Sequence, residues 1–162
     1  MRVLLALILL LNFLPVSADQ PDWVSLGDTV TAAFDENTPD VSKQIYLFQR
    51  CSAQHLSMSW VLEEANTELA ANFDRTSASL AQAAALTRIM LATERTGNQQ
   101  DAEAISKSTL EAITMLFEEY KSWLNSNYIA NGSYFENDID FQLEIEICKM
   151  AAQISMSLLG EP

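Results

Sequence analysis

Glycine and proline are scarce in this sequence, and their scarcity narrows the fold class. The 162 residues include four glycines and four prolines, whereas an all-β sandwich needs a turn signal about every 8 to 12 residues. The sequence therefore argues against an all-β fold and favours a few long elements. Disorder is also disfavoured, because hydrophobic residues make up 49% of the chain and can supply a core.

Basic residues are scarce as well. Nine Lys and Arg stand against 22 Asp and Glu, which gives a formal net charge of -13. Nucleic acid is therefore not expected as a partner, because binding to phosphates depends on clusters of Lys and Arg. Anionic membrane surfaces would repel the same charge. We expect the partner to be a protein or a small ligand instead.

The N-terminus has the features of a cleavable secretory signal peptide. A basic second residue is followed by an apolar run and then by small residues at Val16 and Ala18, as in the usual cleavage site. The run is shorter than the roughly 20 residues that span a bilayer. We predict that residues 1–18 are removed and that residues 19–162 form a single domain, secreted or periplasmic, with no membrane attachment after cleavage.

Helical periodicity predicts a short lead-in helix followed by four long helices. Thr38-Pro39-Asp40 is a start signal, because Thr38 can cap and a proline in the first turn loses no hydrogen bond. We expect the lead-in helix over 22–34, long helices over 38–70, 76–95, 98–124 and 139–158, loops over 72–77 and 125–137, and a helix end at Gly97. Because most loops are short, the sequence predicts an all-α, up-down-up-down four-helix bundle.

The last segment fits two patterns. From Ile139 to Ile147 apolar and polar residues alternate, as they do in a strand. A helical stripe continues further, to Leu158, and no partner strand is evident. We therefore expect a helix whose apolar stripe consists of Ile139, Leu143, Ile147, Met150, Ile154 and Leu158.

The chain has two cysteines, Cys51 and Cys148. In an up-down-up-down bundle the first and fourth helices are antiparallel neighbours, and each cysteine lies roughly 15 Å from the same end of the bundle at 1.5 Å per residue. Because an exported protein meets an oxidising environment, we predict a Cys51–Cys148 disulfide. A catalytic redox pair would instead be expected as a CxxC motif.

The only histidine, His55, lies on the apolar stripe of the helix expected over 38–70. Ser52, Ser59 and Asn66 occupy positions beside it, so this helix has an interior polar seam. Two interpretations remain open: a packed core histidine among small residues, or a polar pocket that holds a ligand or fixes the register of the helices. A catalytic triad cannot be assembled around His55.

Cofactor motifs are not found. There is no CxxCH for c-type haem, and Ser52 stands where a Glu-x-x-His di-iron motif would need glutamate before His55. Zinc lacks a ligand set, and the acidic clusters are typical of solvated helix faces. We expect no metal, no cofactor and no catalytic residue. Asn131-Gly132-Ser133 is a formal glycosylation sequon, relevant only in a eukaryote.

These features predict an exported, soluble, non-catalytic helical bundle that binds a protein partner or a small ligand. One alternative is a periplasmic stress or folding helper, in which protonation of the many carboxylates would remove self-repulsion. The other is a ligand- or haem-binding carrier that uses the polar seam around His55, with a methionine as second axial ligand in the case of haem.

Overall fold

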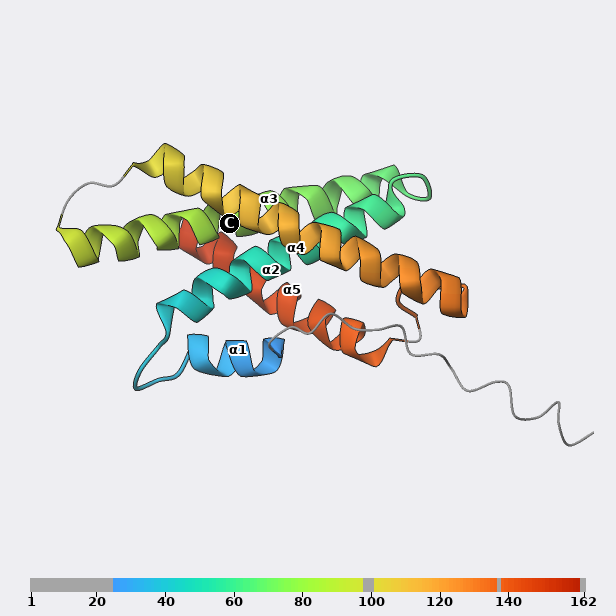
Figure 1. Ribbon diagram of the computed structural model, residues 1–162, viewed down its shortest axis with the longest axis horizontal. Helices are drawn as coiled ribbons and strands as arrows, with labels where there is room; N and C mark the ends of the chain where they lie inside the picture. The colour runs from blue at the N-terminus through green and yellow to red at the C-terminus, as the bar shows by residue number, and fades with distance from the viewer. Residues whose placement is uncertain (1–24, 98–100, 137, 161–162) are drawn as a thin grey trace, which may run out of the picture.

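The computed structural model describes residues 25–97, 101–136 and 138–160. Its regular structure in these ranges is entirely α-helical, which confirms the predicted all-α class. The helices are α1 (Leu26–Ala33), α2 (Val41–Leu62), α3 (Thr67–Thr96), α4 (Ala102–Asn131) and α5 (Ile139–Leu159) (Figure 1). The predicted signal peptide over 1–18 lies outside the described residues. No helix in these ranges is long and apolar enough to cross a membrane.

Side-chain caps and glycines define the ends of the long helices. Each begins after an Asp or Asn whose side chain accepts backbone N–H groups of the first turn: Asp40, Asn66, Asp101 and Asp138. The last three helices end at glycines with positive φ: Gly97, Gly132 and Gly160. Thr38 is not the cap of α2: the Asp40 carboxylate accepts the Ser42 and Lys43 N–H groups instead, and the Thr38 hydroxyl donates to Asp35. The predicted start of the next helix, at residue 98, lies outside the described residues.

The boundary between α2 and α3 differs from the prediction. The first long helix ends at Leu62 rather than near residue 70, and the expected loop over 72–77 lies inside α3. The cause is Asn66, whose side chain accepts the Leu69 N–H at 3.0 Å and so starts a new helix. Leu69, which continues a seven-residue repeat of Val41, Phe48, His55 and Leu62 in the sequence, is consequently exposed.

The connection between α4 and α5 is also shorter than predicted. The segment over 125–137 was expected as a loop, but α4 continues to Asn131. Asn127 accounts for this extension, because its buried amide donates to the Tyr134 carbonyl and to the Asp138 carboxylate, at 3.2 and 2.7 Å. These bonds fasten the last turn of α4 to the start of α5, so that the short loop is held against both helices.

The central helix of the molecule is α2, which contacts each of the other four described helices. In the view of Figure 1, α4 and α5 both cross α2, and α3 and α5 also contact each other. One cluster of core residues surrounds the middle of α2 where it meets α1, α3 and α5, and includes Leu47, Phe48 and Leu80. A second cluster, richer in aromatic residues, lies where α2 meets α4 and α5, and includes Tyr120, Trp123 and Phe141.

The predicted apolar stripe of α5 is largely turned away from the core. Ile139 is 74% exposed and Leu143 is 58% exposed, whereas Ile147 and Ile154 are partly buried against the first cluster. The buried face of α5 consists instead of one aromatic residue and several small or polar ones: Phe141, Glu144, Cys148, Ala151, Ala152 and Ser155. This face allows close approach to α2 and α3, and it leaves part of the stripe in solvent.

Candidate functional site

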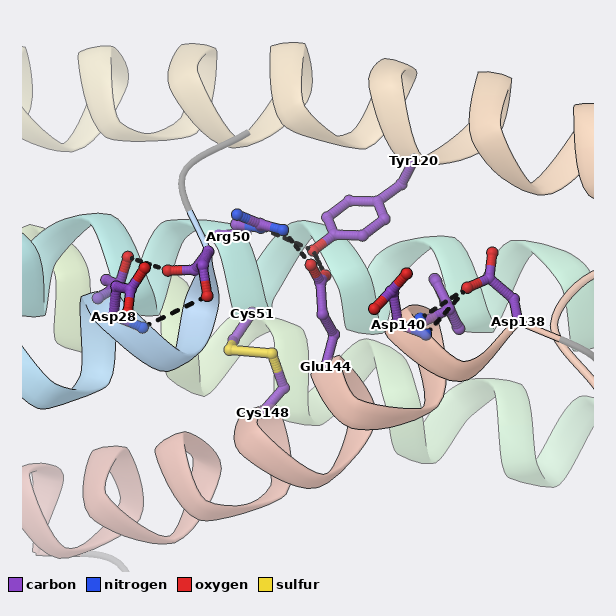
Figure 2. A network of polar contacts seen from close by, with 11 residues as sticks. Asp28, Arg50, Cys51, Tyr120, Asp138, Asp140, Glu144 and Cys148 are labelled. Atoms are coloured by element: carbon purple, nitrogen blue, oxygen red, sulfur yellow. Dashed lines mark hydrogen bonds and ion pairs between the residues drawn. A yellow bond between two sulfur atoms is a disulfide. The ribbon is translucent and has the colours of Figure 1, made fainter. Parts of the chain in front are cut away.

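Two cross-links join α2 to α5 in the middle of the molecule. The first is the disulfide between Cys51 and Cys148, with sulfurs 2.04 Å apart and Cα atoms 5.1 Å apart (Figure 2). Both cysteines are fully buried. They are separated by 97 positions in the sequence. A disulfide that closes a loop of about 100 residues lowers the entropy of the unfolded chain and so stabilises the folded state by about 4.7 kcal/mol.

The second cross-link is an ion pair between Arg50 of α2 and Glu144 of α5, to which Tyr120 of α4 is bonded (Figure 2). The Arg50 Nε donates to the Tyr120 hydroxyl at 3.2 Å, and this hydroxyl donates to the Glu144 carboxylate at 2.5 Å. The exposed fractions are 2% for Arg50, 0% for Tyr120 and 8% for Glu144. Three helices therefore meet at one hydrogen-bonded buried ion pair.

The titration behaviour of this network follows from its burial. Burial raises the pKa of Glu144, although the Arg50 charge opposes the shift. Burial and then the Glu144 charge raise the pKa of Tyr120. For Arg50, burial opposes the charge, but Tyr120 and Glu144 outweigh it and the pKa is raised. Because all three side chains are enclosed, this network fixes how α2, α4 and α5 pack and does not offer a surface to a substrate.

Sequence reasoning missed this network, although a signal for it was present. Arg50 precedes one cysteine directly, and Glu144 precedes the other by one helical turn. Once the two cysteines are paired on antiparallel helices, these two positions lie about 7.5 Å apart along the helix axes at 1.5 Å per residue. A long arginine side chain can cover this offset, so the opposite charges near the disulfide indicate an ion pair.

The polar seam predicted on α2 is present for three of its four members, because Ser52, His55 and Ser59 are all buried. The Ser52 hydroxyl bonds to the carbonyl and hydroxyl of Ser77, and Ser77 donates back to the Ser52 carbonyl, at 2.9 to 3.0 Å. This reciprocal pair fastens α2 to α3. Asn66 does not reach the seam, since it caps α3 instead.

His55 lies between the serine pair and the end of α2. Its Nδ1 is 2.9 Å from the Cys51 carbonyl oxygen, and its ring packs against Phe73 with centroids 5.5 Å apart. Burial lowers the pKa of His55 from 6.5, although the bond to Cys51 opposes this shift. The ring is therefore neutral at pH 7, and it serves as a packed side chain that contacts α3.

One turn beyond His55, the seam reaches a cleft of about 340 Å³ between the end of α2 and the start of α3. The α2–α3 turn that frames it is visible in Figure 1. Phe117 of α4 closes one side, and the other walls are formed chiefly by Ser59, Trp60, Glu63, Ala70 and Asp74. Ser59 is only 7% exposed, and its hydroxyl makes no hydrogen bond to another described residue.

A larger depression of about 890 Å³ runs along α4 past Lys107, Leu110 and Met115. Among the described residues it is lined by this one helix alone, so it has no opposing wall to enclose a ligand. The cleft beside Ser59 is bounded by three helices and is the better candidate site.

Within the described residues, no group of three or more His, Cys, Asp or Glu side chains is placed to hold a metal ion. Comparisons of the chain with family models, curated proteins and solved structures found no match. The geometry of the cleft and its surroundings is therefore the basis for the functional conclusion.

Proposed function

We propose that this chain is an exported, non-catalytic binding protein that takes its ligand in the cleft between α2 and α3. In this proposal residues 1–18 are a signal peptide, and residues 19–162 are a soluble up-down-up-down bundle that acts outside the cytoplasm. The cleft would hold a small molecule or a side chain of a partner protein.

The observation that carries this proposal is the Ser59 hydroxyl. It belongs to a buried side chain, it lines the cleft, and it has no hydrogen-bond partner among the described residues. Most polar groups of a protein interior are paired within the protein, whereas the Ser59 hydroxyl opens onto the cleft and is left to bond to water or to a ligand there. A ligand with a hydrogen-bonding group would supply the missing partner. Mostly apolar walls with a few placed polar groups are typical of ligand sites.

The position of the cleft supports the same proposal. Its walls are helices rather than loops, and α2 is fastened to α3 by the Ser52–Ser77 pair and to α5 by the disulfide. A site on rigid elements loses little conformational entropy when a ligand binds. The cross-links of α2 therefore preorganise the cleft.

A second candidate function, a stress or folding helper outside the cytoplasm, is favoured by the exposed part of the α5 stripe. Ile139, Leu143 and Met150 leave apolar side chains in solvent, and exposed apolar patches are typical of surfaces that bind other proteins. A haem carrier is less favoured, because the His55 ring is buried against Phe73 and the neighbouring cleft of about 340 Å³ is small for a haem.

Native mass spectrometry tests the proposal directly. Protein purified without denaturation from a compartment to which it has been exported should carry an additional mass that is lost on denaturation. The mass identifies the ligand. The proposal would be contradicted if the protein showed only its own mass even after incubation with extract from the same compartment.

A further inference from the structure

The walls of the cleft suggest the charge of the ligand. Its lining includes the rings of Trp60 and Phe117 and the carboxylates of Glu63 and Asp74. Aromatic faces attract cations through their quadrupole, and carboxylates attract them directly. Both kinds of wall therefore favour a positive charge, and neither favours an anion.

The aromatic wall already attracts one cation within the chain. The Lys121 ammonium lies 5.7 Å from the centroid of the Trp60 ring and 5.1 Å from that of Phe117. Lys121 also pairs with Glu118 at 3.1 Å and is not among the residues that line the cleft. The Lys121 ammonium thus contacts both rings at once, and none of the described residues that line the cleft is basic.

Neither carboxylate has a cationic partner among the described residues. Arg50, Lys121 and Lys149 form ion pairs with other acidic residues. Glu63 and Asp74 are exposed at the rim of the cleft. They are free to pair with a charge that enters from solvent, and the net charge of -13 raises the local concentration of cations.

The depth and size of the cleft limit the ligand further. Ser59 places a hydroxyl in the buried part of the wall, where its oxygen can accept an N–H, and Ala70 leaves space beside it. A volume of about 340 Å³ is near the lower end of ligand sites, which range over about 300–1,000 Å³. This volume suits one short chain with a charged end and excludes a haem or a dinucleotide.

We infer that the cleft binds an ammonium or guanidinium group on a short alkyl stem. The inference rests on the proposed function and specifies the ligand of that same site. The stem would pack against Trp60 and Phe117, the charged end would pair with Glu63 or Asp74, and one N–H would reach the Ser59 hydroxyl. A free amine and a Lys or Arg side chain of a partner share this chemistry.

Calorimetric titration of the purified oxidised protein with agmatine tests the inference. n-Pentanol and pentanoate, of similar length but neutral or anionic, serve as ligand controls. We expect one site for agmatine, weaker binding at high salt, and no saturable binding of the two controls. Glu63→Gln and Asp74→Asn should each weaken binding about fivefold, the effect of losing one partly exposed charge contact. Glu64→Gln removes the same charge one residue away, outside the cleft lining, and should change the affinity less than twofold.

Equal effects of Glu63→Gln and Glu64→Gln, or equal binding of agmatine and pentanol, would overturn the inference. In that case a ligand retained in native mass spectrometry would still support the proposed function with a different chemistry. A peptide with a single arginine separates the two sources of the cation. Binding at least tenfold tighter than agmatine assigns the group to a partner protein, and equal or weaker binding assigns it to a free amine.

Discussion

Arg50 and Glu144 form their ion pair beside the Cys51–Cys148 disulfide, so α2 is joined twice to neighbouring turns of α5 (Figure 2). The ion pair adds α4 to this junction through the Tyr120 hydroxyl. The central helix is thus joined to α5 by a covalent and an electrostatic link and to α4 by a hydrogen bond, and α5 also contacts α3. The cleft lies further along the same helix, between α2 and α3.

Removing one partner of the ion pair should destabilise the protein strongly. Glu144→Ala leaves Arg50 buried without its carboxylate, and the loss of such a partner costs about 3–5 kcal/mol. Urea denaturation of the wild type and the variant, followed by circular dichroism, measures the difference.

The triple variant Arg50→Met, Tyr120→Phe, Glu144→Leu is the matched control. It removes every polar group of the network, and well-packed apolar replacements of buried ion pairs are often neutral. We expect it to be more stable than Glu144→Ala alone. If the triple variant is instead less stable than Glu144→Ala, and its loss equals the sum of the losses of the three single variants, the three side chains do not act as one network.

Reduction of the disulfide should lower the free energy of unfolding by about 2–5 kcal/mol. Because Arg50 and Glu144 still join α2 to α5, the reduced protein should keep its helical circular dichroism at room temperature. The comparison is one of urea midpoints with and without reductant, and the Cys51→Ala, Cys148→Ala variant serves as a control that does not respond to reductant. Coincident midpoints for the wild type would show that the two cysteines are not linked in solution.

Mild acid should destabilise the protein through His55. Burial lowers the pKa of its ring below 6.5, so the unfolded chain takes up the proton first as the pH falls. The contribution of neutral His55 is present above pH 6.5 and is lost as the pH falls from 6.5 through the lower pKa of the folded state. We expect unfolding free energies measured between pH 7.5 and about 5 to decrease in the wild type.

In His55→Leu this decrease should be smaller, and the variant should fold as well as the wild type at pH 7, because leucine needs no hydrogen bond. Glu144 acts with the opposite sign. Its pKa is raised above 4.5, so its protonation favours the folded state and its contribution is lost as the pH rises through the raised value. An unchanged pH dependence in His55→Leu would mean that His55 does not cause the acid sensitivity.

The orientation of α5 can be tested on its two faces. Leu143 is exposed and Ala151 is fully buried, although the apolar stripe in the sequence suggests the opposite for Leu143. Leu143→Gln should change the free energy of unfolding by no more than about 0.5 kcal/mol, as for most surface substitutions. Ala151→Gln places a large polar group in the core and should cost more than about 2 kcal/mol. Similar costs for the two variants would contradict the orientation of α5.

The sequence predicted the features that depend on local residue patterns: the helices and the cysteine pair. Scarce glycine and proline predicted long helices, and matched positions of Cys51 and Cys148 on neighbouring helices predicted their link. It did not predict the break at Asn66, because the seven-residue repeat continues past this residue to Leu69, which is exposed in the structure and whose N–H is bonded to the Asn66 side chain. Hydrophobic periodicity does not detect a cap that interrupts it.

The candidate site was predicted only in part, for a different reason. The seam residues Ser52, His55 and Ser59 lie on one helix, and helical spacing places them on one side of it. The cleft depends on Ala70 and Asp74 of α3 and on Phe117 of α4. Their proximity to Ser59 follows from where α3 begins, and this boundary was predicted in the wrong place. The Arg50, Tyr120 and Glu144 network likewise needs three helices to be placed before it can be seen.

The central claim is that the cleft beside Ser59 holds the ligand, and a pair of matched tryptophan variants tests it most directly. Ala71 is exposed and lines the cleft, whereas Ala78 is exposed on the same helix and does not line it. In native mass spectra of the exported protein, Ala71→Trp should lose the ligand mass and Ala78→Trp should retain it. Retention of the ligand mass by a folded Ala71→Trp protein would contradict the account.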